Sequence, residues 1–303
     1  MKRTSVVVAA IAMLFAPGAF ATDLALPHDT TPRYTKAPPM VDPGYDWSGF
    51  YAGVNVGYGW GRSSTVGSFN DATSGELLSS TANKFDMNGV TGGGQVGYNW
   101  QRANWVFGLE ADIQASGQKG STTAVCAGAS GTLNGLCTLG HHGDIVNDPG
   151  LPVTSDLTEK LEWFGTVRGR VGSTITPSVL VYATGGLAYG EISTTETVTG
   201  TNISGLPGQD GATRTPVAAS FRNSTTKVGW TAGAGVEGAL GGNWTAKLEY
   251  LYLDLGTVSG SFTTPIVAPS GAFLATGYSS HVTDNVLRAG VNYRFGGSTL
   301  AKY

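Results

Sequence analysis

The chain has 303 residues, of which 46 are glycine and only 13% are charged, and its formal net charge is −3. Low charge at near-neutral hydropathy argues against a long disordered chain, and abundant glycine favours strands and loops over helices. The small negative charge gives no reason to expect a nucleic-acid partner. No apolar stretch of about 18 residues follows the first 21 residues, which excludes a helical membrane span there.

The N-terminus has the pattern of a secretory signal peptide. Lys2 and Arg3 are followed by an apolar run over residues 6–15 and by small residues up to Ala21. This order predicts a signal peptide over residues 1–21, cleaved after Ala21, because the apolar run is too short for the alternative, a retained anchor. Residues 22–46 contain five prolines and no periodic apolar pattern, which predicts an extended periplasmic leader.

From residue 47 onward, apolar and polar residues alternate in the way typical of strands. The last such stretch, residues 284–295, has Leu287, Ala289, Val291, Tyr293 and Phe295 on one face and Val286, Arg288, Gly290, Asn292 and Arg294 on the other. An apolar outer face over an inner face with arginines is typical of a membrane barrel. Similar stretches begin near residues 47, 89, 105, 161, 179, 227 and 244. Residues 47–303 are therefore predicted to form an eight-stranded antiparallel transmembrane β-barrel.

The connections between these stretches alternate in length. Long gaps cover residues 61–87, 116–160, 192–225 and 257–283, and short gaps cover 101–104, 174–178 and 241–243. Short periplasmic turns and long extracellular loops are typical of outer-membrane barrels. The parity of the outward residues also agrees with the length of each short turn, since directly opposed residues share a face.

The predicted inward face carries equal numbers of acids and bases. The acids are Glu110, Asp112, Glu162, Glu237 and Glu249, and the bases are Arg168, Arg170, Lys247, Arg288 and Arg294. An eight-stranded barrel has an interior that side chains fill, so we expect these charges to neutralise one another and plug the lumen. The most specific expected contact is Glu237 with Lys247, and the alternative is a charge-lined ion path.

Two cysteines, Cys126 and Cys137, lie in the second long gap, and two cysteines in an exported chain usually pair. We therefore expect a disulfide within this loop. His141 and His142 nearby could instead belong to a metal or haem site, but neighbouring histidines diverge in an extended chain and match no zinc pattern.

Six tryptophans are predicted to face outward and form an aromatic girdle: Trp60, Trp100, Trp105, Trp163, Trp230 and Trp244. The alternative is that they are core aromatics of a soluble barrel. The segment Gly233–Gly238 matches the dinucleotide motif GxGxxG, but it lies in a strand with no helix after it, so we expect no nucleotide site. No Ser-His-Asp or Cys-His arrangement is expected to converge, and therefore no catalytic, cofactor or metal site is predicted.

Three motifs resemble the outer-membrane immunogenic protein family, which are small porin-family barrels of Gram-negative bacteria related in architecture to the OmpA and OmpX membrane domains. They are WSGFYAGVNVGYGWG at residues 47–61, YTKAPPM at 34–40 and VLRAGVNYRFGG at 286–297. The resemblance implies an outer-membrane barrel exposed as a surface antigen. Some members resemble haem-binding or host-contact proteins, but no haem-ligand motif carries over. The chain end also resembles a barrel-assembly signal, with Arg288, Gly290 and Tyr293 followed by a terminal aromatic, either Phe295 or Tyr303.

These features favour a structural and surface-antigen role over enzymatic activity. Expected partners are outer-membrane lipid, lipopolysaccharide and the barrel-assembly machinery, with an unidentified extracellular ligand as a further possibility. Loop-mediated binding of haem or a host ligand, and a narrow diffusion channel, are the alternative functions. A soluble ligand-carrying barrel would need the inverse arrangement of polar and apolar faces.

Overall fold

The computed structural model describes residues 45–126, 153–204, 213–267 and 273–296, and the statements below concern these residues. The chain divides into two units, residues 1–43 and 44–303, and every described residue lies in the second unit. The predicted signal peptide and nearly all of the leader, together with Cys137, His141, His142 and Tyr303, lie outside the described residues.

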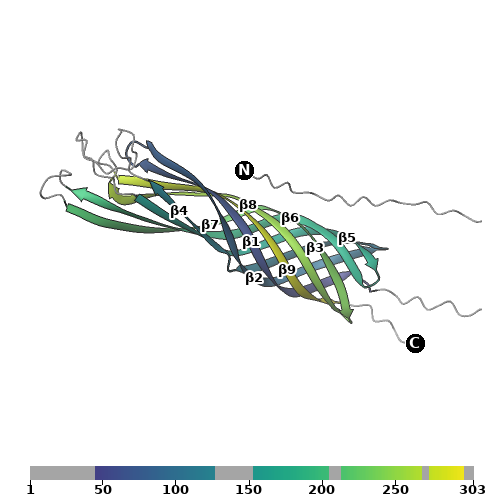
Figure 1. The fold of residues 1–303 in the computed structure, drawn as a ribbon. Helices are drawn as coiled ribbons and strands as arrows, with labels where there is room; N and C mark the ends of the chain where they lie inside the picture. Colours follow the sequence, from purple (N-terminus) through teal and green to yellow (C-terminus); the bar gives the residue numbers. More distant parts are fainter. Residues whose placement is uncertain (1–44, 127–152, 205–212, 268–272, 297–303) are drawn as a thin grey trace, which may run out of the picture. The chain divides into compact units, whose positions relative to one another are not determined.

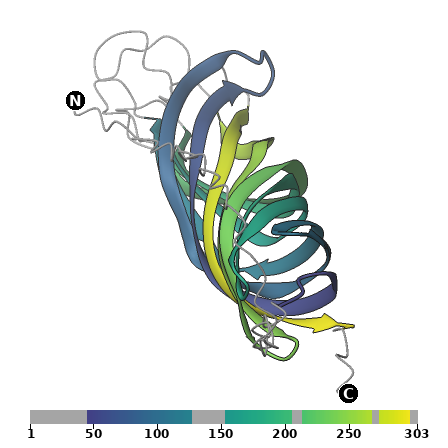
Figure 2. The same cartoon turned by 90° about the vertical axis from the view of Figure 1, so that its right-hand side faces the viewer.

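The described chain forms nine strands that make one closed antiparallel sheet (Figures 1 and 2). They are β1 (Gly49–Asp71), β2 (Leu77–Arg102), β3 (Trp105–Ser116), β4 (Lys119–Cys126), β5 (Val153–Thr176), β6 (Val179–Ser204), β7 (Thr213–Gly241), β8 (Trp244–Val267) and β9 (Phe273–Phe295). The strands β3 and β4 occupy one position in the wall, because both pair with β5, and β1 pairs with β9 to close the ring. The prediction of an eight-stranded antiparallel barrel is thus confirmed.

The break between β3 and β4 turns one side chain into the barrel. Gln118 is buried and its Nε2 donates a hydrogen bond of 2.8 Å to Asp284 Oδ2 on β9. A Cβ atom at Gly59 would collide with the Gln118 side chain, and one at Gly89 would collide with the backbone of Gly117. The two glycines therefore leave the space that this inward turn requires.

The strands continue far into the stretches that were expected to be loops. The β1–β2 ladder reaches Ser68–Ser80, and the β6–β7 ladder reaches Ser204–Thr213. Strand β4 and the start of β5 likewise lie within residues 116–160. The prediction of long loops over all of residues 61–87, 116–160, 192–225 and 257–283 was therefore wrong. These stretches are rich in threonine and serine. Threonine favours strands, but it is polar, so these strands lack the apolar alternation by which the others were recognised.

Three tight turns lie at the end of the barrel where β1 begins and β9 ends, which we call the terminal end. They join Arg102 to Trp105, Thr176 to Val179 and Gly241 to Trp244, as the sequence predicted. We call the opposite part of the barrel the extension. It is formed by β1 from residue 62, β2 up to 87, β4, β5 up to 162, β6 from 191, β7 up to 229, β8 from 255 and β9 up to 284.

Between the terminal end and the extension, the outer surface is an apolar band. Val54 is 61% exposed and Leu248 is 49% exposed, as are many other large apolar side chains at this level. Five of the six expected girdle tryptophans are 41–56% exposed on this surface (Trp60, Trp100, Trp105, Trp230 and Trp244), and Trp163 is half-buried. No helix in the described part of the chain is long and apolar enough to span a membrane.

The interior has three layers rather than one polar lumen. At the terminal end, Trp47 packs with Val106, Leu180 and Tyr182. A charged layer follows. Above it lies an apolar cluster that includes Met87, Leu161, Phe164, Leu251 and Val286. Apolar layers therefore lie on both sides of the charged layer, in an interior that was expected to be polar.

Small residues on the inward face make room for aromatic side chains. A Cβ atom at Gly97 on β2 would collide with the Tyr51 ring and hydroxyl, whereas one at Gly94 on the same strand would meet nothing closer than Gly53 O at 3.5 Å. Gly97→Ala is therefore expected to lower the free energy of unfolding by about 1–3 kcal/mol. Gly94→Ala should change it by less than about 1 kcal/mol. Urea unfolding of the detergent-folded protein measures both, and equal effects of the two substitutions would contradict the packing.

Candidate functional site: a charge network inside the barrel

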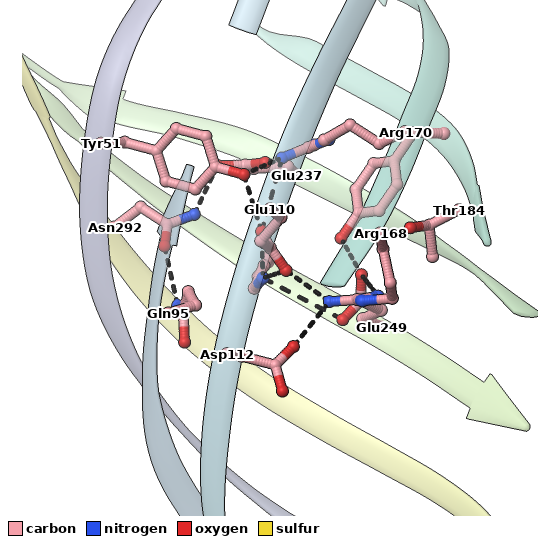
Figure 3. Close-up of polar contacts among 12 residues, drawn as sticks. Tyr51, Gln95, Glu110, Asp112, Arg168, Arg170, Thr184, Glu237, Glu249 and Asn292 are labelled. Carbon is pink, nitrogen blue, oxygen red and sulfur yellow. Dashed lines mark hydrogen bonds and ion pairs between the residues drawn. The ribbon is translucent and has the colours of Figure 1, made fainter. Parts of the chain in front are cut away.

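Eight ionic side chains from five strands meet in the middle layer. Figure 3 labels Glu110, Asp112, Arg168, Arg170, Glu237 and Glu249 among them. The acids are Glu110 and Asp112 on β3, Glu237 on β7 and Glu249 on β8, and the bases are Arg168 and Arg170 on β5, Lys247 on β8 and Arg288 on β9. Each is at most 5% exposed. Strand alternation points all eight inward, and their formal charges sum to zero. We call this group the lumen network.

Two guanidinium groups form the centre of the lumen network. Arg168 binds Glu110 Oε1 through Nη2, Asp112 Oδ2 at 2.9 Å and Glu249 Oε1 at 3.0 Å. Arg288 donates from Nε to Glu249 Oε2 at 2.8 Å and from Nη2 to Asp112 Oδ2 at 3.0 Å. The ladder sets this geometry, because Glu110 lies directly opposite Arg168 and Glu249 directly opposite Arg288.

The remaining ionic groups connect this centre to the terminal end. Arg170 Nη2 lies 2.7 Å from Glu237 Oε2, and its guanidinium stacks 3.9 Å from the centre of the Tyr182 ring. Lys247 Nζ lies 2.9 Å from Glu110 Oε2. Each of these charges therefore has a partner of opposite sign, which offsets the cost of removing it from water.

Uncharged side chains complete the lumen network. The Tyr51 hydroxyl donates to Glu110 Oε2 at 2.7 Å, and the Tyr182 hydroxyl donates to Glu249 Oε1 at 3.0 Å. Asn292 donates to Glu237 Oε1 at 2.8 Å. Sequence reasoning named only the ionic members, although the alternation that located them also places these three residues on the inward face.

The predicted contact between Glu237 and Lys247 is only partly correct. The two residues are directly opposite in the β7–β8 ladder, as predicted. However, the ion pairs of the described residues include none between their side chains. Lys247 binds Glu110, and Glu237 binds Arg170 and accepts a hydrogen bond from Thr245 Oγ1. Long side chains reach across the narrow lumen, so the strand register alone does not determine the partners.

Two expected members of the lumen network lie elsewhere. A bulge between Leu161 and Trp163 turns Leu161 inward, so that Glu162 is left partly exposed and pairs with Lys160 and Arg222. The inward prediction for Glu162 was therefore wrong. Arg294 is buried at the terminal end, where Nη1 donates to Ser48 O at 3.0 Å and the guanidinium lies 4.8 Å from the Tyr45 ring centre.

The other predicted site residues are located as follows. Cys126 is a buried residue at the end of β4, and because Cys137 lies outside the described residues the disulfide stays a prediction. In the expected assembly signal, Tyr293 and Phe295 contact each other on the outer face. Recognition of this signal also stays a prediction.

The segment Gly233–Gly238 lies within β7 and leads into another strand, not a helix. Its Gly235 leaves room for Tyr182, because a Cβ atom there would lie 2.6 Å from the Tyr182 hydroxyl oxygen. The dinucleotide pattern is therefore explained here by packing. In the described part of the chain, no three His, Cys, Asp or Glu side chains are grouped to hold a metal ion.

A double-mutant cycle distinguishes the observed partners from the expected pair. Arg170→Met and Glu237→Gln should each lower the free energy of unfolding by about 3–5 kcal/mol, because each leaves a buried charge unpaired. Their coupling energy should exceed that between Glu237→Gln and Lys247→Met by at least about 1 kcal/mol. Urea unfolding in detergent measures the cycle. Glu162→Gln, at an exposed pair, is the control and should cost less than about 1 kcal/mol. A larger coupling for Glu237 with Lys247 would contradict the geometry.

Comparisons with known proteins agree with the barrel. The family model described as outer membrane protein beta-barrel domain matches residues 7–295. The 31 kDa outer-membrane immunogenic protein of Brucella melitensis is 36% identical over 291 residues, which cover 96% of this chain and 99% of that protein. The 25 kDa outer-membrane immunogenic protein of Brucella canis is 28% identical and covers 82% of this chain and 83% of its own.

Solved structures of low similarity were also found. The attachment invasion locus protein Ail of Yersinia pestis aligns at 12% identity with a TM-score of 0.33, covering 82% of this chain and 99% of its own. Neisserial surface protein A aligns at 13% identity with a TM-score of 0.30, covering 82% and 98%. From the family match and the similarity to the Brucella proteins over nearly its whole length, the chain belongs to the outer membrane protein beta-barrel family and is an outer-membrane protein.

Proposed function

We propose that this protein is a non-conducting barrel that anchors and displays its extension at the cell surface. The observation that carries this proposal is the lumen network, whose four acids and four bases are all buried and cross-linked. An ion that entered this layer would have to separate paired charges in a poorly hydrated space, which costs several kcal/mol for each charge left unpaired. The lumen network therefore acts as a plug.

A second closure supports the plug at the terminal end. Trp47 is 2% exposed inside the barrel mouth, and its backbone N–H donates to Gln101 Oε1 at 2.8 Å. Tyr45 packs edge-on against it with ring centres 4.8 Å apart. An aromatic pair in this position excludes water from the lumen below the charged layer.

A third closure lies above the lumen network. The side chains of Phe164, Leu251 and Val286 are fully buried in the apolar layer, and those of Met87 and Leu161 are nearly so. Apolar constrictions close pores because they exclude water. Three layers of different chemistry thus oppose conduction, which favours the structural role over the diffusion channel.

Surface display follows from the shape of the wall. The ladders continue well beyond the apolar band, which leaves the extension outside the region that lipid would cover. The printed names of the Brucella relatives describe them as immunogenic, which fits exposure of such an extension. No described side chain points to a haem or host-ligand site, so we do not extend the proposal to a specific ligand.

Single-channel recording in a planar lipid bilayer tests this function. The refolded mature protein should give no current steps above the bilayer baseline under an applied voltage, and a general porin in the same bilayer is the positive control. The Trp47→Ala variant should also give no current steps, because the lumen network and the apolar layer still close the barrel. Discrete, reproducible steps from the wild-type protein would contradict the plugged barrel.

A further inference from the structure

The wall of the extension is divided along two seams. Between β2 and β4 the ladder consists of the single pair Asn88–Lys119. Between β7 and β8 the ladder ends at Trp230–Asp254, although β7 reaches back to Thr213 and β8 continues to Val267. Among the described residues, no ladder crosses either seam farther out. The extension therefore consists of two four-stranded sheets, β2-β1-β9-β8 and β4-β5-β6-β7.

Side chains, not backbone ladders, hold these two sheets face to face. The first sheet contributes Phe69, Leu78, Ile266 and Leu274 to an apolar cluster, and the second contributes Ala124, Cys126, Val153 and Val198. Across the β7–β8 seam, the rings of Phe221 and Phe262 stack with centres 4.9 Å apart. Such contacts can separate without breaking either sheet, and Figure 1 shows the ends of β6 and β7 standing apart from the other strands.

Two acidic side chains are buried between the sheets without a partner of opposite charge. Glu159 on β5 is 0% exposed, and neither of its carboxylate oxygens has a hydrogen-bond partner, although the Ser63 and Ser280 hydroxyls lie nearby. Glu196 on β6 is 2% exposed. Its Oε1 accepts a hydrogen bond of 2.7 Å from Ser155, and its Oε2 has no partner.

Among the side chains that the structure describes, the surrounding strands supply no buried base. Besides the two glutamates, the titratable side chains that face this interior are Asp71 of β1 and Asp284 and Tyr278 of β9, while the described side chains of β2, β4 and β8 include none that titrates. Burial also raises the pKa of the Asp284 carboxyl, to about 7, so its ionisation acts in the same direction as that of Glu159. Lys227 of β7 is half-buried at the edge of the second sheet. All buried arginines and lysines of the described chain belong to the lumen network or to Arg294.

A small cavity lies between the sheets beside Glu196. It holds about 20 Å³ and is lined by residues that include Thr65 and Phe69 of β1, Ser155 of β5, and Tyr278 of β9. That volume is sufficient for a single water molecule. A water molecule in this cavity would lie between the two sheets and beside Glu196.

The charge state of Glu159 decides whether this arrangement is favourable. A buried, unpaired carboxylate costs several kcal/mol, whereas its protonated form does not carry this cost. Burial raises the pKa of the Glu159 carboxyl above its usual range. Because the closed form binds this proton more tightly than an open form, closure is most stable in acid and weakens as the pH rises above the ordinary range for a carboxyl group.

We propose that the extension is a proton-controlled clamp, whose two sheets pack together when the buried carboxyl group of Glu159 is protonated and part along the seams when it ionises. The lumen network provides the contrast within the same molecule, since its acids are balanced by bases and need no proton. The clamp does not depend on the plugged lumen, so the two proposals can fail separately.

Hydrogen–deuterium exchange of the detergent-folded full-length mature protein tests the clamp. From about pH 5 to about pH 8, after correction for intrinsic exchange, protection of residues 155–161 and 194–200 should fall by about tenfold or more, because the closed form holds the Glu159 proton more tightly than the open form does. Protection of residues 105–114 in the lumen should stay constant. The variant Glu159→Gln should lose much of this pH dependence and keep higher protection than the wild type at about pH 8.

Two matched variants serve as controls for this experiment. Glu162→Gln removes a partly exposed, ion-paired acid of β5 and should behave as the wild type. His281→Gln removes an imidazole whose Nε2 lies 3.5 Å from Asp254 Oδ2 and should keep the pH dependence. If Glu159→Gln does not fold, the pH dependence of protection in the wild type and in these two variants still tests the proposal. Three results would overturn the proposal. They are protection of the wild type that does not change with pH, protection in Glu159→Gln that falls with pH as in the wild type, and protection in His281→Gln that no longer depends on pH.

Discussion

The pairing of Arg168 and Arg288 with Glu110, Asp112 and Glu249 is the interaction on which the barrel depends. An eight-stranded barrel encloses only enough space for side chains, so polar groups that face inward cannot rely on bulk water. They must be neutralised by one another, and the directly opposed pairs of the β3–β5 and β8–β9 ladders achieve this. Because side chains alternate along each strand, placing the ionic residues inward leaves the alternate, outward positions for apolar side chains.

The same molecule treats buried charge in two different ways. In the middle layer, acids and bases are equal in number and every one of these charges has a partner of opposite sign. In the extension, Glu159 and Glu196 are buried with no base beside them, between two sheets that no ladder joins. The first arrangement stabilises a closed and permanent structure. The second makes the packing of the extension sensitive to protons, which is why we expect dynamics there and not in the barrel below.

Alternation in the sequence was sufficient to predict the eight strand positions in the wall, the tight turns and the face of most residues, because a membrane barrel repeats one rule along every strand. The break that divides one position into β3 and β4 was not predicted. Glu162 shows where prediction from alternation fails, because a single bulged residue moves the neighbouring side chains to the face opposite the one predicted. The ion-pair partners of Lys247 and Glu237 were also not predicted. The lumen is so narrow that each of these side chains can reach partners on several strands. The length of the extension was missed where polar residues occupy both faces. Trp47 stands at the start of the first alternating stretch, and alternation alone did not reveal that its side chain closes the barrel mouth.

The central claim is that apolar side chains point away from the barrel into lipid while the ionic ones point into it. Spin labels at Val54 and Leu248, attached through cysteine in a background without Cys126 and Cys137, test it directly in reconstituted vesicles. A third label at Lys84, on the outer face of the extension, is the water-exposed reference. The account predicts strong relaxation by lipid-soluble oxygen and little by a water-soluble nickel complex at Val54 and Leu248, with the reverse at Lys84. Equal access of the nickel complex to all three positions would contradict it.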